Sequence, residues 1–175
     1  MDNVGFWGQL RVGHKIGLIG ALFLTAIVGI IASTVMWLGS TETDTVVMDV
    51  MGRQRELVSL YARDSVLGLT GQEVESRYWS NVYMESGKSL MDGGSTVLTL
   101  KKDQKVSLPP APTQELRDML SETITRFEEL STMVGQVSGI QRDSPAYAAK
   151  AKDILAFGTK LRERVNEVTK AYEKH

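Results

Sequence analysis

The hydrophobic pattern of the chain begins with one long apolar run. From Ile16 to Leu38 the sequence IGLIGALFLTAIVGIIASTVMWL contains no charged residue. At about 1.5 Å per residue, a helix of this length crosses a hydrocarbon core of about 30 Å. A cleaved signal peptide has a shorter apolar run, of about 7 to 15 residues. The pattern therefore favours a transmembrane helix over a signal peptide.

Beyond the apolar run, hydrophobic positions recur at helical spacing and no proline occurs before Pro109. We predict that the first helix continues to about residue 69 and that a second runs over about 72–91, each ending at glycines. The segment at about 94–112 carries prolines and a lysine cluster. We expect it to be a long connection rather than a helix.

Two further helices are predicted after this loop. Thr113 offers an N-cap hydroxyl for the third helix, and Gly135 and Gly139 weaken its end. Ser144 and Pro145 predict the start of the fourth, because Ser caps free N–H groups and Pro at the first position loses no hydrogen bond. Its apolar residues follow at alternating spacings of four and three, as in a helix bundle. They are Tyr147, Ala151, Ile154, Gly158, Leu161, Val165, Val168 and Tyr172.

These patterns predict an all-α fold in which an N-terminal transmembrane helix, 16–38, leads into an antiparallel four-helix bundle over 40–175. Basic residues precede the apolar run and acidic residues follow it: Arg11, His14, Lys15, then Glu42 and Asp44. The positive-inside rule places 1–15 in the cytoplasm and 40–175 in the periplasm or outside, with the anchor in the inner membrane. The fourth helix returns to the membrane side. We therefore expect a fragment of a longer receptor, although a one-span protein remains open.

The amino-acid composition limits the kinds of site that this chain can form. The chain has 20 basic and 21 acidic residues, so a strongly basic nucleic-acid face is not expected. It has no cysteine and only two histidines, His14 and His175, which excludes thiol catalysis, disulfides and the common zinc sites. No Gly-rich phosphate loop follows a strand, and acidic pairs such as Glu128-Glu129 are ordinary surface charges. We predict no enzyme activity, catalytic residue, metal or cofactor.

A candidate binding site lies in VVMDVMGRQRELVSLYARD, residues 46–64. On a helix this stretch has one apolar face for the core and a neighbouring face of mostly small residues with one long cation. That neighbouring face consists of Met48, Gly52, Arg55, Ser59 and Ala62. If it meets the same face of a second chain, symmetry brings two copies of Arg55 together. Two buried guanidinium groups need a counter-charge, which a planar anion supplies.

The alternative is that both arginines of this stretch are ordinary surface charges. Arg53 points away from the small-residue face and is expected to be solvated or paired. Along the helix, Arg53 and Arg55 have Glu56 and Asp49 as acidic neighbours. Each exposed pair of this kind contributes only about 0.3 to 0.5 kcal/mol.

Two segments carry a resemblance to a known family. MGRQRELVSLYARD resembles the signature that opens the PilJ-type domain, the N-terminal sensor of type IV pili methyl-accepting chemotaxis transducers, and LPPAPTQELRDMLSETITRFEEL resembles that family's second landmark. The family is similar to the periplasmic sensor of nitrate and nitrite sensor kinases, a four-helix bundle that dimerises through its first helix. The resemblance implies that an anion is held at the dimer interface by Arg55, three residues after Gly52. Arg53 and Gln54 match the signature in a supporting or packing role, whereas Glu56 replaces its usual Met.

Together these observations predict a membrane-anchored extracytoplasmic sensor of a bacterial receptor of the chemotaxis type. We expect a homodimer that binds a small anion such as nitrate or nitrite and transmits a helix displacement. The alternative is a protein-interaction module that senses a type IV pilus subunit or another protein without a small ligand. Its most obvious contact surface is the loop that contains Lys101, Lys102 and Lys105.

Overall fold

The computed structural model describes residues 12–100, 104–137, 140–141 and 143–174 of the chain. It divides into two compact units, Met1–Glu42 and Thr43–His175. Several residues named above lie outside the described part: Arg11, Lys101, Lys102, Gly139 and His175. The side chains of Lys15 and Glu42 are not described either.

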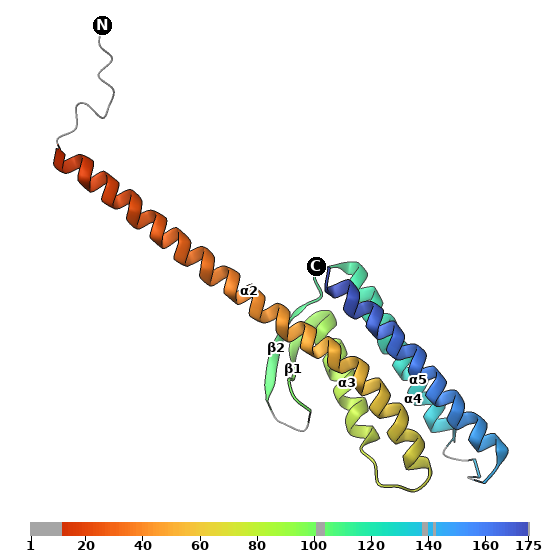
Figure 1. Ribbon diagram of the computed structural model, residues 1–175. Coiled ribbons are helices and arrows are strands. Elements are labelled where there is room, and N and C mark those ends of the chain that lie inside the picture. Colours follow the sequence, from red (N-terminus) through yellow and green to blue (C-terminus); the bar gives the residue numbers. More distant parts are fainter. Residues whose placement is uncertain (1–11, 101–103, 138–139, 142, 175) are drawn as a thin grey trace. The chain divides into compact units, whose positions relative to one another are not determined.

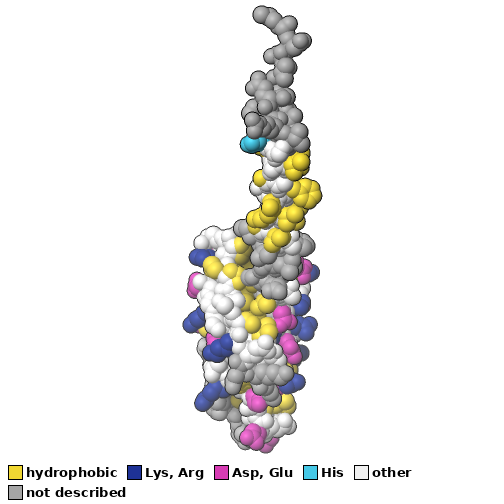
Figure 2. All heavy atoms as spheres, turned by 90° about the vertical axis from the view of Figure 1, so that its left-hand side faces the viewer, with side chains coloured by type: hydrophobic (Ala, Val, Ile, Leu, Met, Phe, Trp, Pro, Cys, Tyr) yellow, Lys and Arg dark blue, Asp and Glu magenta, His cyan; other side chains and the backbone are white. Residues whose placement is uncertain are grey.

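The first unit contains the N-terminal part of helix α2, Val12–Leu69. Within it, Ile16–Thr34 is long and apolar enough to cross a membrane by length and composition. Its large apolar side chains are exposed, and hydrophobic side chains occupy much of the face seen in Figure 2. An apolar surface of this extent is unfavourable in water, which agrees with the predicted anchor. The orientation of the chain across a membrane stays a prediction.

The end of α2 agrees with the prediction, but the next helix begins later than expected. After Leu69, Gly71 adopts φ +86°, in the left-handed region that commonly ends helices. A Cβ on Gly68 would lie 2.8 Å from the Val74 side chain, so the chain folds back closely over α2 here. Helix α3, Ser76–Asp92, therefore starts after this turn rather than at about Gln72.

Asp64 joins α2 to α3 through a buried hydrogen bond. The Trp79 indole Nε1–H donates to Asp64 Oδ2 at 2.7 Å, and Arg63 donates to the other carboxylate oxygen at 2.8 Å. Burial alone would raise the pKa of Asp64, but the hydrogen bonds from Trp79 and Arg63 outweigh it and hold that pKa below its usual value. The carboxylate is therefore ionised at neutral pH and accepts the hydrogen bond of a buried indole N–H.

The two later helices begin at the predicted caps. In α4, Gln114–Val137, the Thr113 hydroxyl accepts a hydrogen bond from the backbone N–H of Leu116 at 3.2 Å. In α5, Pro145–Tyr172, the Ser144 hydroxyl accepts from the N–H of Tyr147 at 3.2 Å. The two helices pack side by side (Figure 1). The predicted apolar seam faces inward, with its central members buried: Ile154, Gly158, Leu161, Val165 and Val168.

The segment between α3 and α4 forms a β-hairpin, which the predicted all-α fold did not include. Strands β1, Gly93–Val97, and β2, Lys105–Pro110, pair antiparallel with Gly94 opposite Leu108 (Figure 1). Gly93 and Gly94 have φ of +80° and +138°, which turns the chain directly from the helix into β1. Prolines are tolerated because each strand of a two-stranded sheet keeps one unpaired edge. The chain is thus mostly helical but not all-α.

The core of the second unit consists of two hydrophobic clusters. One contains Leu57, Val58, Tyr61, Ala62, Trp79, Val82, Tyr83, Phe127, Leu130, Val137, Ile154, Leu161 and Val165. The other contains Val47, Val50, Met51, Leu90, Leu108, Ala111, Leu116, Leu120 and Val168. Three buried polar residues separate the two clusters along the helices: Gln54 on α2, Ser86 on α3 and Thr123 on α4. We call these three residues the polar layer. The Gln54 side-chain amide donates to the Ser86 hydroxyl at 2.8 Å.

Candidate functional site

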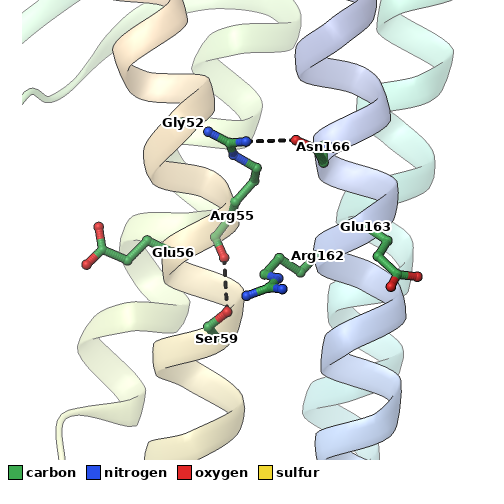
Figure 3. Close-up of a pocket in the computed structure, with 7 residues that line it drawn as sticks. All are labelled: Gly52, Arg55, Glu56, Ser59, Arg162, Glu163 and Asn166. Carbon is green, nitrogen blue, oxygen red and sulfur yellow. Dashed lines mark hydrogen bonds between the residues drawn. The ribbon is translucent and has the colours of Figure 1, made fainter.

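A groove between α2 and α5 contains the central part of the predicted site (Figure 3). Its volume is about 600 Å³. The residues that line it are Gly52, Arg55, Glu56 and Ser59 on α2, and Arg162, Glu163 and Asn166 on α5. The structure thus brings Gly52, Arg55 and Ser59 of the small-residue face together at one groove. It also adds residues of α5, which the sequence had not linked to this site.

Arg55 folds back along α2 so that its guanidinium lies over Gly52. A Cβ on Gly52 would lie 3.6 Å from Arg55 Nη2, which is ordinary van der Waals contact. Arg55 Nη1 donates a hydrogen bond to Asn166 Oδ1 at 2.7 Å, across the groove (Figure 3). Because glycine has no side chain, the guanidinium can rest against the helix surface while its other donors stay available. This contact gives a physical reason for a glycine three residues before the arginine.

The charges around the groove are separated by sign. In Figure 3 the Arg162 side chain extends from α5 toward Ser59 of α2, whereas Glu56 and Glu163 point away from the groove on opposite sides. Within the described residues, neither Arg55 nor Arg162 forms a salt bridge. Two arginines and two glutamates line the groove. The guanidinium groups lie between α2 and α5, where Figure 3 shows no carboxylate, and this part of the groove suits an anion.

The ends of the small-residue face are used differently from its middle. Ala62 is only 4% exposed, and its Cβ lies 2.9 Å from the position a Cβ on Gly158 would occupy. Ala62 therefore serves the close approach of α2 and α5 within one chain and has little surface left for a second chain. Met48 is half-buried and lines a separate hollow beside the prolines of the hairpin. A dimer through the remaining residues of this face stays a prediction.

Arg53, predicted to be solvated or paired, lies outside the groove and is buried rather than solvated. It is 8% exposed, and its Nη1 donates to the carbonyl oxygen of Leu98, just after β1. Its Nε and Nη2 are buried without a hydrogen-bond partner. Burial lowers the pKa of Arg53, while the nearby Asp49 carboxylate acts in the opposite direction. The sequence pattern gave no sign of this burial, because it depends on the hairpin that covers the side chain.

Gln54 has a packing role in the structure. Its amide donates to the Tyr83 carbonyl oxygen at 3.2 Å and to the Ser86 hydroxyl, both on α3. It is 3% exposed and does not line the groove. Successive helical residues point about 100° apart, so Arg53, Gln54 and Arg55 face three different neighbours.

Arg162 and Asn166 are two of the three groove residues on α5, none of which the sequence patterns indicated. Each follows a seam residue of α5, Leu161 and Val165 respectively, and they stand four positions apart. Residues at this spacing share one helix face, so they form a polar strip along the edge of the buried seam. The spacing of these two residues could have predicted polar side chains beside the core. It does not indicate which helix lies opposite them.

No protein-family model, curated protein or solved structure matches this chain. The resemblance to the PilJ-type domain therefore rests on the two quoted motifs. Among the described residues, no group of three or more His, Asp or Glu side chains is placed to hold a metal ion.

Proposed function

We propose that the chain is the membrane-anchored sensing domain of a bacterial transmembrane receptor of the methyl-accepting chemotaxis type, similar to PilJ-type domains. A small anion such as nitrate or nitrite binds in the groove beside Arg55, on the extracytoplasmic side. One observation carries this proposal: a half-buried guanidinium lies over Gly52 in an open groove from which the neighbouring carboxylates point away.

A ligand in the groove must compete with Asn166 for hydrogen bonds from Arg55. Arg55 already donates to the neutral oxygen of Asn166. An anion adds charge attraction and can accept two N–H bonds from the guanidinium, whereas Asn166 offers one neutral oxygen, so an anion draws the guanidinium away from Asn166 or shares it. Binding therefore changes the polar link between α2 and α5. That change is the first step of the proposed signal.

The second step uses the helix that contains Arg55. In the proposed antiparallel four-helix bundle, α2 supplies both the ligand-binding residue and the apolar stretch Ile16–Thr34. The anion favours one position of α2 over another and shifts the population between them. The size of the shift is limited by the difference in affinity for the two positions. The proposed receptor is a homodimer through α2, where Gly52, Arg55 and Ser59 remain at least partly exposed.

Titration calorimetry of the full chain in detergent with nitrate tests the site. We expect Arg55→Gln to weaken binding at least tenfold, because the guanidinium supplies the charge. Arg77→Gln is the matched control, since Arg77 is an exposed arginine on α3 that does not line the groove. Equal nitrate binding by the wild-type chain and both variants would exclude Arg55 as the ligand-binding residue.

A further inference from the structure

Arg162 gives the groove a second cation, on the helix opposite Arg55. We propose that the groove binds an elongated dianion, a short dicarboxylate, within a single chain. Arg55 holds one carboxylate and Arg162 holds the other. This inference rests on the proposed function, because it assumes that the groove is an anion site, and it specifies the ligand and the second ligand-binding residue.

The two guanidinium groups lie at different heights along the groove. Arg55 rests over Gly52 and contacts Asn166, whereas Arg162 extends toward Ser59 (Figure 3). A smaller hollow of about 180 Å³ next to the groove is lined by Ser59 and Arg162 but not by Arg55. Gly52 and Ser59 are separated by seven residues, which is about 10 Å along a helix at about 1.5 Å per residue. Arg55 and Arg162 therefore lie beside different turns of α2.

Because the two cations lie beside different turns of α2, a ligand with two separated charges suits them better than one small planar ion. Two carboxylates joined by a short carbon chain place one charge beside each guanidinium. They also supply one negative charge for each guanidinium, which a single monovalent anion does not.

The groove is large enough for a short dicarboxylate, and Arg55 is already positioned in it before a ligand binds. Its volume of about 600 Å³ lies within the range of about 300 to 1,000 Å³ that is usual for small-molecule sites. Asn166 holds Arg55 in place before a ligand arrives, which reduces the rotamer entropy lost on binding. All of these residues belong to one chain, so the site does not need a second copy.

The test is titration calorimetry of the full chain in detergent with three probes: succinate, propionate and nitrate. Propionate is succinate without one carboxylate, so it reports on a single arginine. We expect succinate to bind with one ion per chain, and propionate and nitrate to bind at least tenfold more weakly. Arg55→Gln and Arg162→Gln should each weaken succinate binding at least tenfold. Lys160→Gln removes the same charge from an exposed position on α5 outside the groove, and should leave succinate binding unchanged.

The possible results separate this inference from the proposed function. Nitrate binding that needs Arg55 but is insensitive to Arg162→Gln would overturn the dicarboxylate site and leave the anion sensor in place. One succinate per two chains would overturn the single-chain site. The absence of binding by any of the three probes would refute both proposals. Circular dichroism melting of each variant without ligand checks that the substitutions leave the fold intact.

Discussion

The contact between Gly158 and Ala62 makes a sharp prediction about how closely α2 and α5 must approach. A Cβ added to Gly158 would lie 2.9 Å from the Ala62 Cβ, whereas carbon atoms in favourable contact are about 3.5 to 4.0 Å apart. Gly158→Ala therefore requires α2 and α5 to separate locally by about 0.6 to 1.1 Å. Overpacking of this kind costs about 1 to 3 kcal/mol.

An opposing effect must be subtracted. Alanine favours a helix interior over glycine by about 1 kcal/mol, so we expect Gly158→Ala to lower stability by about 0 to 2 kcal/mol. In an Ala62→Gly background the clash is absent, and the same substitution should stabilise the protein by about 1 kcal/mol. The informative quantity is the difference between the effects of Gly158→Ala on the unfolding free energy in the two backgrounds. For a unit of this size, each kcal/mol shifts the melting temperature by roughly 4 °C.

The assay is thermal unfolding of the full chain in detergent, followed by circular dichroism at a helical wavelength. The two backgrounds should differ by about 1 to 3 kcal/mol in their response to Gly158→Ala. Gly135→Ala is a further control, since a Cβ there would meet nothing within 4 Å, and it should be neutral or stabilising. If Gly158→Ala has the same effect in both backgrounds, the helices do not approach at this point as described.

Three further predictions concern stability. Asp64→Asn should cost about 1 kcal/mol at pH 7, because a charged acceptor is replaced by a neutral one for Trp79. Since folding lowers the pKa of Asp64, its contribution is present above the unfolded value of about 3.9 and is lost as pH falls through the folded pKa. Urea unfolding at pH 7 and pH 3 should therefore show the gap closing in acid, and an equal gap at both would contradict this. Arg53→Met should change stability by less than about 1 kcal/mol or raise it, because two buried N–H donors lack partners; a loss above about 2 kcal/mol in urea unfolding would show that its bond to Leu98 holds the hairpin. Ser144→Ala should lower the unfolding free energy by about 1 kcal/mol and Ser144→Gly by only a few tenths, and equal losses would argue against the cap.

The parts of the fold that could be predicted depend on neighbours in sequence. The caps at Thr113 and Ser144, the end of α2 and the seam of α5 each follow from residues within a few positions of one another. The hairpin could not be predicted in this way. Its strands are short, its prolines argue against a strand, and its pairing places Leu108 against residues that are distant in sequence.

The candidate site shows the same division. The small-residue face and Arg55 could be read from α2 alone, since helical geometry fixes which residues share a face. The contribution of Arg162 and Asn166 could not be read there. A heptad seam identifies the buried face of α5 but does not state which helix lies beside each edge of that face. The burial of Arg53 required the hairpin, which the pattern had missed.

The polar layer has a consequence for the movement of α2. Gln54 donates to Ser86 at 2.8 Å and to the Tyr83 carbonyl at 3.2 Å, with an apolar cluster on either side of it along the helix. A slide of α2 by one full turn, about 5.4 Å, would place this amide in an apolar cluster without partners. Shifts of about 1 to 2 Å are the size usual for helices that transmit a signal. If α2 moves as proposed, the layer is therefore expected to permit short displacements, to resist long ones and to define the register to which the helix returns.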